Sequence, residues 1–589
     1  MQDQPARFEE YRAHQLGEDQ MKMKMKTILM GAATAMALAP MAAQAGRGDD
    51  GNLNIIYWQA VSILNPFLSG GTKDIHASAL IIEPLARYDE NGAMVPWLVD
   101  AIPTVANGGI SEDLTSITWK ITPGIKWSDG TAFTAHDAVF TAGYCMAPDG
   151  GCAQLAQFSD VTNVEALDDL TVKVTFGKPK PFPYGPFVGG QSPIIQAAQF
   201  ADCVGASAPE CTDANFGPVG TGPFTVKEFR ANDVVTMVAN EHYRDANLPH
   251  FASLTFKGGG DAAAAARSVL ETGEFDYAWN LQIDPAILAQ MASAGNGTVV
   301  SAFGTSVERI MVNLTNPDAA LGDKRSTVEG GPHPFLTDGK VREALSLAID
   351  RNTLAEVGYG EAGKATCNVL PAPAIYNSTA NDSCLVQDMA KANAILDDAG
   401  WAKGSDGIRA KDDVRLSILY QTSTNAVRQD TQALVKQWWS EIGVETELKN
   451  ISASVFFGGD QSSPDTYQKL FADIEMYTNN FNGTDPEAYM GGWVCSEIPN
   501  PSNNWLGNNM PRYCNAEYDA LSAEMGGTSD LNERARLAKA MNDLLMRDGA
   551  MIPLVHRGSV SAHANTLAGV RMNVWDSETW NAAEWSRSN

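Results

Sequence analysis

The pattern of residues 414–448 constrains the fold more than any other feature of this 589-residue chain. Four apolar side chains first alternate with other residues, which predicts a strand: Val414, Leu416, Ile418 and Tyr420. Leu434, Trp438 and Ile442 then keep helical spacing, Gly443 ends the helix, and residues 444–448 read as a second strand. A strand–helix–strand unit implies parallel pairing, because parallel strands need a crossover connection. The pattern therefore predicts an α/β fold.

Strand and helix signals are mixed along the rest of the chain, without a short-period repeat or a low-complexity linker. Alternating apolar residues on both sides of a Pro-Gly turn predict a hairpin: Ile117, Trp119, Ile121, Ile125 and Trp127. Thr134 and Asp137 have the spacing of a capping box and predict a helix start. Because the 544 residues after position 45 exceed what one hydrophobic core usually supports, at least two domains are expected.

The amino terminus has the pattern of a secretory signal peptide. Lys22, Lys24 and Lys26 precede an apolar run that ends in Ala-Gln-Ala at 43–45, and this run is too short for the roughly 20 residues that span a bilayer. We therefore expect a mature chain that begins at Gly46 in a periplasm. Residues 1–20 precede a second start at Met21 and are expected to be an upstream extension.

All eight cysteines follow the signal peptide, and they form four couples that are close in sequence. An even number of cysteines in an exported chain predicts disulfides. The expected pairing joins neighbours: Cys145 with Cys152, Cys203 with Cys211, Cys367 with Cys384, and Cys495 with Cys514. Buried free thiols are the alternative. No cysteine lies near the cleavage site, so no lipid anchor is expected.

Composition excludes one class of partner. Residues 1–45 hold five basic and five acidic side chains, so the mature chain keeps the net charge of −28. A phosphate backbone needs a basic footprint, and nucleic acid is therefore not expected as a partner. The acidic residues are spread along the chain without a long run of one sign, which indicates a soluble surface. No segment after the signal peptide is long and apolar enough to span a membrane.

The stretch from Trp119 to Phe140 has the most specific pattern in the chain, Trp-Lys-Ile-Thr-Pro-Gly-Ile-Lys-Trp-Ser-Asp-Gly-Thr-Ala-Phe-Thr-Ala-His-Asp-Ala-Val-Phe. With four further matches in the same order, at 220–224, 240–243, 273–276 and 341–351, it resembles the family 5 extracellular solute-binding proteins of ATP-driven (ABC) importers. That family includes dipeptide, oligopeptide and nickel binders. Most of the matched residues are expected to be scaffold, so the resemblance indicates the class and not the solute.

The resemblance implies a two-lobed periplasmic-binding-protein fold of α/β class that closes on its ligand by a hinge motion. We expect lobe I to comprise residues 46–82, 216–306 and 550–589, with an extra subdomain at 83–215. Lobe II is expected at 307–549.

Candidate ligand-binding residues follow from the rule that open α/β sheets bind ligands at the carboxyl ends of their strands. They are Trp58, Gln59, Trp279, Asn280, Tyr477, Asn480, Asn482 and Asp485. Two alternatives stay open. The tryptophans could belong to the core, and the asparagines of the loop could serve only to satisfy backbone groups.

Asn482 departs from the pattern of the family. Peptide binders of this family often carry an aspartate three residues before an Asp-Pro pair, here Asp485-Pro486, and its carboxylate meets the ammonium terminus of the peptide. An amide in its place weakens such a site by roughly 2–5 kcal/mol. Either Asp485 or another acid replaces the missing charge, or the ligand is not an ordinary peptide.

A secreted hydrolase acting on small peptides or glycans is the rival class. The sequence contains no His-Glu-x-x-His motif and no Gly-x-Ser-x-Gly motif. Residues 358–364 match a phosphate-binding loop, but Ala365 stands where a Ser or Thr should follow, so we interpret them as a glycine-rich helix exit. No metal, cofactor or catalytic residue is expected.

We therefore predict a non-enzymatic receptor in the periplasm, monomeric and not embedded in the membrane. It would deliver a small solute to an inner-membrane permease driven by a cytoplasmic ATPase. A peptide or peptide-like solute is favoured, while oligosaccharides, opines, polyamines and metal chelates remain alternatives.

Overall fold

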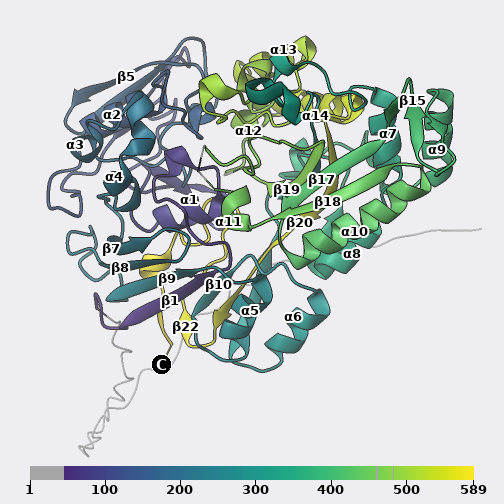
Figure 1. The fold of residues 1–589 in the computed structure, drawn as a ribbon. Coiled ribbons are helices and arrows are strands. Elements are labelled where there is room, and N and C mark those ends of the chain that lie inside the picture. The colour runs from purple at the N-terminus through teal and green to yellow at the C-terminus, as the bar shows by residue number, and fades with distance from the viewer. Residues whose placement is uncertain (1–45, 459, 461, 482, 589) are drawn as a thin grey trace, which may run out of the picture. The chain divides into compact units, whose positions relative to one another are not determined.

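A computed structural model describes residues 46–458, 460, 462–481 and 483–588. The signal-peptide prediction and Asn482 lie outside these described residues. The described residues form one compact unit with two large mixed sheets and four smaller sheets of two or three strands (Figure 1). Within the described residues, no helix is both long and apolar enough to cross a bilayer.

The first large sheet has seven strands in the order β11-β21-β10-β1-β9-β8-β7. Their bounds are β1 Asn52–Tyr57, β7 Phe224–Arg230, β8 Val234–Ala239, β9 Ser253–Gly258, β10 Tyr277–Trp279, β11 Gly297–Ala302 and β21 Ser559–Ala564. β1 pairs in parallel with both β9 and β10, so the carboxyl ends of these three strands meet at one edge of the sheet. Helix α5 (Ala262–Leu270) packs against β10 and β21, and α6 (Pro285–Ala292) lies beside it.

The second large sheet has six strands in the order β13-β20-β12-β19-β17-β18. Their bounds are β12 Val307–Val312, β13 Gly363–Ala365, β17 Ser417–Ser423, β18 Glu445–Ile451, β19 Ile474–Asn479 and β20 Met551–Arg557. The predicted strand–helix–strand unit is confirmed as β17, α10 (Ala426–Glu441) and β18, with β17 and β18 parallel.

Helices cover both faces of the six-stranded sheet (Figure 1). One face packs on α7 (Gly339–Leu347), α8 (Arg351–Tyr359), α9 (Met389–Asp398) and α10. The other face packs on α12 (Glu487–Gly491), α13 (Ala516–Gly526) and α14 (Leu531–Asp548). Short helix α11 (Ala453–Phe456) follows β18.

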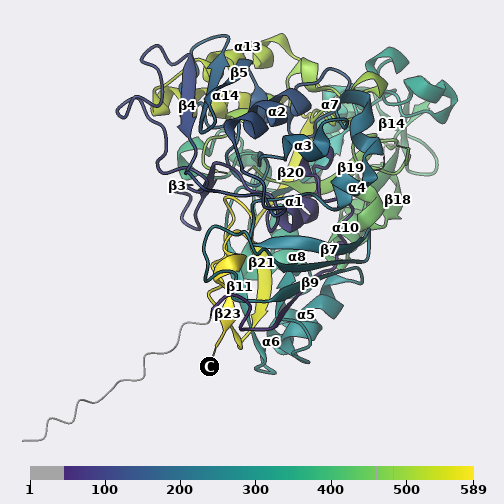
Figure 2. The same cartoon turned by 90° about the vertical axis from the view of Figure 1, so that its left-hand side faces the viewer.

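Two passages of the chain connect the large sheets. Residues 303–306 join β11 to β12, and Gly558 alone joins β20 to β21. Figure 2 shows β20 in the upper part of the view and β21 below it, next to β11. β20 lies in the stretch expected to belong to lobe I, and it pairs with β12 in the six-stranded sheet, whereas β21 pairs in the seven-stranded sheet. The lobe bounds expected from the sequence stay a prediction; the chain passes between the two sheets at Gly558.

The third sheet, β4-β6-β5, lies in the segment 83–215. Its strands are β4 Ser116–Lys120, β5 Val161–Asp168 and β6 Thr171–Phe176, and helix α2 (Ala135–Cys145) packs on it. The capping box of Thr134 and Asp137 begins α2 as predicted. The predicted hairpin is wrong: β4 pairs with β6, and residues 125–127 form only an isolated bridge at Lys126. Alternation specified which side chains are buried, but it did not specify the partner strand.

The remaining elements are short. They are helices α1 (Thr72–Ser78), α3 (Ala197–Phe200) and α4 (Thr212–Phe216), and strands β2 (Ala86–Tyr88), β3 (Met94–Pro96), β14 (Ala402–Lys403), β15 (Arg409–Lys411), β16 (Val414–Arg415), β22 (Leu567–Ala568) and β23 (Ser586–Arg587). The glycine-rich segment predicted as a helix exit follows the end of α8 at Tyr359 and leads into β13.

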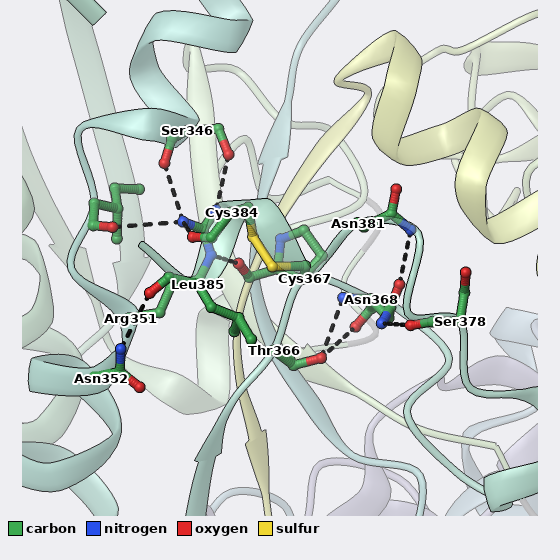
Figure 3. The surroundings of a disulfide bond; sticks show 12 residues. Ser346, Arg351, Asn352, Thr366, Cys367, Asn368, Ser378, Asn381, Cys384 and Leu385 are labelled. Carbon is green, nitrogen blue, oxygen red and sulfur yellow. Dashed lines mark hydrogen bonds between the residues drawn. A yellow bond between two sulfur atoms is a disulfide. The ribbon is translucent and has the colours of Figure 1, made fainter. Parts of the chain in front are cut away.

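All eight cysteines form disulfides in the pairing expected between neighbours. The Cys367–Cys384 bridge ties the segment after β13 to the short turn Asp382–Leu385, which lies beside the start of α8 (Figure 3). There the buried Arg351 donates to the carbonyls of Cys384 (3.0 Å) and Ser346 (3.0 Å), and Asn352 donates to the carbonyl of Leu385 (3.1 Å). This bridge thus fixes a long loop over the helix that packs on β20.

Candidate functional site

A small chamber lies between the two large sheets, where their connecting passages meet. Its volume is about 100 Å³. Gln59, Trp279 and Asn280 line it from the carboxyl ends of β1 and β10, and Tyr477 and Asn480 line it from the carboxyl end of β19. The other lining residues are Gly70, Gly71, Thr72, Lys73, His76, Ser306, Arg428, Phe457, Tyr467, Thr478, Asn479, Arg557, Ser559, Asn573, Val574, Asp576 and Glu578. The small chamber therefore draws its walls from both sheets.

Trp58, also predicted to contact ligand, lies elsewhere. It is buried in an apolar cluster with residues of α5 and α6, and it lines neither chamber described here. Its indole NH donates to the carbonyl of Asn280 at 2.8 Å. Trp58 and Gln59 both follow the end of β1, and of the two only Gln59 lines the small chamber. Trp58 thus contacts the backbone of Asn280 and not the chamber.

Asn280 has the backbone conformation that most non-glycine residues avoid, with φ at 57°. Its carbonyl is held by Trp58, and its side-chain oxygen accepts from the guanidinium of Arg557 at 2.5 Å. A strained backbone persists only where the surroundings impose it, and such positions cluster at functional sites. The conformation aims the Asn280 amide at Arg557 across the two sheets.

Arg557, the last residue of β20, is 6% exposed and lines the small chamber. It donates to Asn280 and to Thr478 (3.3 Å), while its Nε has no hydrogen-bond partner among the described residues. Burial lowers the pKa of this guanidinium below its ordinary value. A buried donor without a partner is costly, so this nitrogen is suited to an acceptor on a bound molecule.

The nearest carboxylate to Arg557 is already engaged. Glu308 of β12 accepts from Arg428 at 2.8 Å and 3.2 Å, whereas it lies 3.9 Å from Arg557. Burial alone would raise the pKa of Glu308, but Arg428 and Arg557 hold it below the ordinary value. One carboxylate thus faces two guanidinium groups, and this side of the small chamber has an excess positive charge.

The opposite charge is supplied by Glu578, which is 3% exposed. Its Oε2 accepts from the hydroxyls of Tyr277 (2.5 Å) and Ser561 (2.7 Å), and no ion pair of Glu578 exists within the described part of the chain. Burial raises the pKa of Glu578 to about 7. A second lining acid, Asp576, differs because Arg87 pairs with it at 3.2 Å.

Aromatic rings form a rigid wall beside these charges. Trp279 stacks on Tyr57 with ring centroids 4.5 Å apart, and His76 contacts both rings edge-on. Burial lowers the pKa of His76 to about 3, so the imidazole is neutral at physiological pH, and its Nδ1 lies 3.0 Å from the Tyr57 hydroxyl.

A second, larger chamber of about 550 Å³ adjoins the first. The two chambers share Gly70, Tyr467, Asn479 and Asn480 as lining residues. The large chamber lies between segments of the region 83–215, mainly 153–160 and 178–191, and the loop and helices at 479–526. Aromatic residues on its walls include Phe158, Phe182, Tyr184, Phe481, Tyr489 and Trp493.

Three charged side chains of the large chamber, Lys180, Asp485 and Glu487, form ion pairs. Lys180 of the 83–215 segment pairs with Asp160 (3.1 Å) and with Glu487 of α12. Asp485, which was predicted to contact ligand, lines this chamber, but Arg534 of α14 binds both of its oxygens at 2.6–2.9 Å. Asp485 therefore does not replace the charge missing at position 482. Glu487 also accepts from Arg534 at 2.9 Å.

The sequence interpretation missed Arg557 and Glu578. The rule that selected Gln59 and Asn280 applies equally to Arg557, since it ends a buried strand, but 551–557 was not recognised as part of this edge. Glu578 lies in a segment without regular structure, and no sequence signal indicates it. Within the described residues, no group of three or more His, Cys, Asp or Glu side chains could hold a metal ion.

Known proteins resemble this chain over most of its length. A glutathione-binding protein, GsiB, of Salmonella paratyphi A is 25% identical over 464 residues, which is 78% of this chain and 81% of that protein. The oligopeptide-binding protein AppA of Bacillus subtilis, solved with a nonapeptide, superposes with a TM-score of 0.77 at 21% identity, covering 92% of this chain and all of AppA. NikZ of Campylobacter jejuni, solved with Ni(L-His), superposes with a TM-score of 0.75 at 23% identity, covering 91% and 99%.

These likenesses confirm the two-lobed α/β fold expected from the sequence. The model of the bacterial extracellular solute-binding proteins, family 5, matches residues 93–506, which is more than half of the chain. The chain therefore belongs to the family 5 bacterial extracellular solute-binding proteins.

Proposed function

We propose that this protein is the periplasmic solute-binding component of an ABC importer and that it captures a peptide-like solute carrying a carboxylate. The main support for this proposal is Arg557. Its side chain lines the small chamber and is more than nine-tenths buried, and its Nε has no hydrogen-bond partner among the described residues. Guanidinium groups bind carboxylates with charge-assisted hydrogen bonds, which are about twice as strong as neutral ones.

The two chambers together suit a solute of peptide size. Ligand pockets usually measure about 300–1,000 Å³, and the large chamber of about 550 Å³ continues from the small one. Both aromatic and polar side chains line the two chambers, which is typical of sites that hold a ligand with both apolar and polar groups. Family membership and the name of the GsiB relative support a peptide-like solute.

The receptor would act as a monomer in the periplasm and deliver its solute to an inner-membrane permease driven by a cytoplasmic ATPase. It would return the solute unchanged. The family comprises binding proteins, and this supports a receptor over a hydrolase.

The experiment is capture from a defined pool. Mature protein, freed of endogenous solute by unfolding and refolding, is incubated with an equimolar pool of di- and tripeptides that includes glutathione, and retained molecules are identified by mass spectrometry. We expect a few pool members to be retained and to be recovered intact. Retention of no peptide, or recovery of hydrolysed peptides, would contradict the proposal. Protein purified from a periplasmic extract and then denatured should release a mass of the same class.

A further inference from the structure

The small chamber contains one positive and one negative site that are not paired with each other. Arg557 lacks a partner at Nε, and the carboxylate nearest to it is bound by Arg428. Glu578 accepts hydrogen bonds from neutral groups, the hydroxyls of Tyr277 and Ser561 and the side chain of Trp279, and it has no ion pair with Arg557 in the described structure. Each group is more than nine-tenths buried, so each has lost most of its hydration.

Burying two opposite charges near each other without pairing them is unfavourable for the empty protein. A bound molecule with an ammonium and a carboxylate would compensate both at once. The small chamber holds about 100 Å³, so these two groups must be close together on the solute. An ammonium and a carboxylate on the same carbon satisfy that condition, whereas the two termini of an ordinary peptide are separated by at least one further residue.

We propose that the small chamber binds an intact α-amino-acid group, with its ammonium on Glu578 and its carboxylate on Arg557. The rest of the solute extends past Asn479 and Asn480 into the large chamber, because these residues line both. The solute class is therefore an amino acid extended through its side chain, such as a γ-glutamyl peptide, in which the α-amino and α-carboxyl groups both remain free. This inference rests on the proposed function and narrows its solute class.

The proposal also accounts for the loop that departs from the peptide-binding pattern. An amide at position 482 cannot form an ion pair with an ammonium group, and Asp485 is bound by Arg534. Glu578 comes from a segment almost one hundred residues further along the chain and supplies a carboxylate in a different wall. A solute held by Glu578 needs no charge from the loop.

Three matched probes test the proposal by titration calorimetry: γ-L-glutamyl-L-alanine, its isomer α-L-glutamyl-L-alanine, and N-acetyl-γ-L-glutamyl-L-alanine. We expect the γ-isomer to bind at least about thirtyfold more tightly than either of the others, the loss typical of an unpaired buried charge. Glu578→Gln should weaken binding of the γ-isomer about thirtyfold and change binding of the acetylated probe little.

Glu584→Gln is the control, because Glu584 lies on the same segment, is exposed and pairs with Arg571 outside the chamber. Its affinity for the γ-isomer should equal that of the wild type, and both variants should have circular dichroism spectra of the folded protein.

Equal binding of the α- and γ-isomers would overturn the α-amino-acid assignment and leave the proposed function standing. Equal affinity of Glu578→Gln and wild type for the γ-isomer would overturn the role of Glu578. If none of the three probes binds but the protein retains members of the peptide pool, only this inference fails. If the protein also retains no peptide from the pool, the proposed function fails too.

Discussion

The two chambers have adjoining walls but treat charge in opposite ways. In the large chamber, Lys180, Asp485 and Glu487 are joined to partners from a different segment of the chain. In the small chamber, Arg557 has only a distant carboxylate, Glu308 at 3.9 Å, which Arg428 already binds, and Glu578 has no ion pair within the described residues. A paired network stabilises one arrangement of the protein. Buried charges without an ion-pair partner are instead available to bind the charged groups of a solute.

This difference suggests a division of tasks. Charges of the large chamber hold the 83–215 segment against the helices of the six-stranded sheet, so their loss should lower stability. Charges of the small chamber select the solute, so their loss should lower affinity and leave stability almost unchanged. The four predictions below test whether the charges of the two chambers have these separate effects on stability and on affinity.

The largest expected effect is on stability, from Arg534→Ala. Arg534 is 3% exposed and binds Asp485 and Glu487, so its removal leaves buried carboxylates with one partner fewer. Breaking such a buried pair typically costs about 3–5 kcal/mol. Urea unfolding followed by tryptophan fluorescence should show a fall of this size in the free energy of unfolding. Arg536→Ala on the same helix is the control, because its exposed pair with Glu533 should be worth no more than about 1 kcal/mol. Equal losses in the two variants would argue against a structural role for the large-chamber network.

The second effect is on affinity, from Arg557→Gln. We expect the tightest-binding member of the peptide pool to lose about 2–5 kcal/mol of binding free energy, because its carboxylate loses a buried partner. The free energy of unfolding should change much less, since Glu308 keeps its two hydrogen bonds from Arg428. Titration calorimetry and urea unfolding of the same preparation separate the two quantities. A variant that binds normally but unfolds easily would assign Arg557 to the structure and not to the solute.

The third effect is the pH dependence of affinity. Burial raises the pKa of Glu578 to about 7, and only its ionised form can pair with an ammonium group. Affinity for γ-L-glutamyl-L-alanine should therefore fall about tenfold from pH 8 to pH 6, as expected when protonation of one group opposes binding.

Two neighbours of Glu578 have pKa values far from this window: burial holds the pKa of Tyr277 well above its ordinary value, and that of His76 is about 3. Burial also raises the pKa of Asp576, although Arg87 opposes this rise, and Arg557 stays charged. Glu578→Gln should remove the pH dependence, and a slope that persists in this variant would assign it to another group.

The smallest effect should come from Lys180→Met. Lys180 is buried and bridges the 83–215 segment and α12 through Asp160 and Glu487. Its loss should lower the free energy of unfolding by about 1 kcal/mol or less and leave solute affinity unchanged, because Asp160 keeps Lys178 at 3.2 Å and Glu487 keeps Arg534 at 2.9 Å. Urea unfolding and titration calorimetry measure the two quantities. A hundredfold loss of affinity would instead place Lys180 in direct contact with the solute.

Local and covalent features were predictable from the sequence. The Thr134–Asp137 capping box, the parallel strands around α10 and the four disulfides depend on residues that are near each other in the chain. The edge where chamber-lining residues gather was also predictable in part, since Gln59, Trp279 and Asn280 lie at or just after the carboxyl ends of strands that meet there.

The charges that distinguish the chambers were not predictable. Arg557 and Glu578 are brought to Asn280 by the topology of two sheets, and nothing in the spacing of these residues encodes that meeting. Asp485 is the converse case, a charge that the sequence suggested to be free for a ligand but that is paired in the structure. Its place beside Pro486 indicated a ligand contact, whereas its partner Arg534 lies on a helix 49 residues away. Whether a buried charge is free or paired depends on such distant partners.

The passage from β20 to β21 takes a single residue, Gly558, and its neighbours Arg557 and Ser559 both line the small chamber. If the two sheets turn about this passage, atoms close to the axis move least and atoms on long lever arms move most. The small chamber would then keep much of its geometry while the walls of the large chamber, which includes no residue of the passage, swing apart. A solute could first be gripped by its α-amino-acid end at the pivot and afterwards be enclosed along its length.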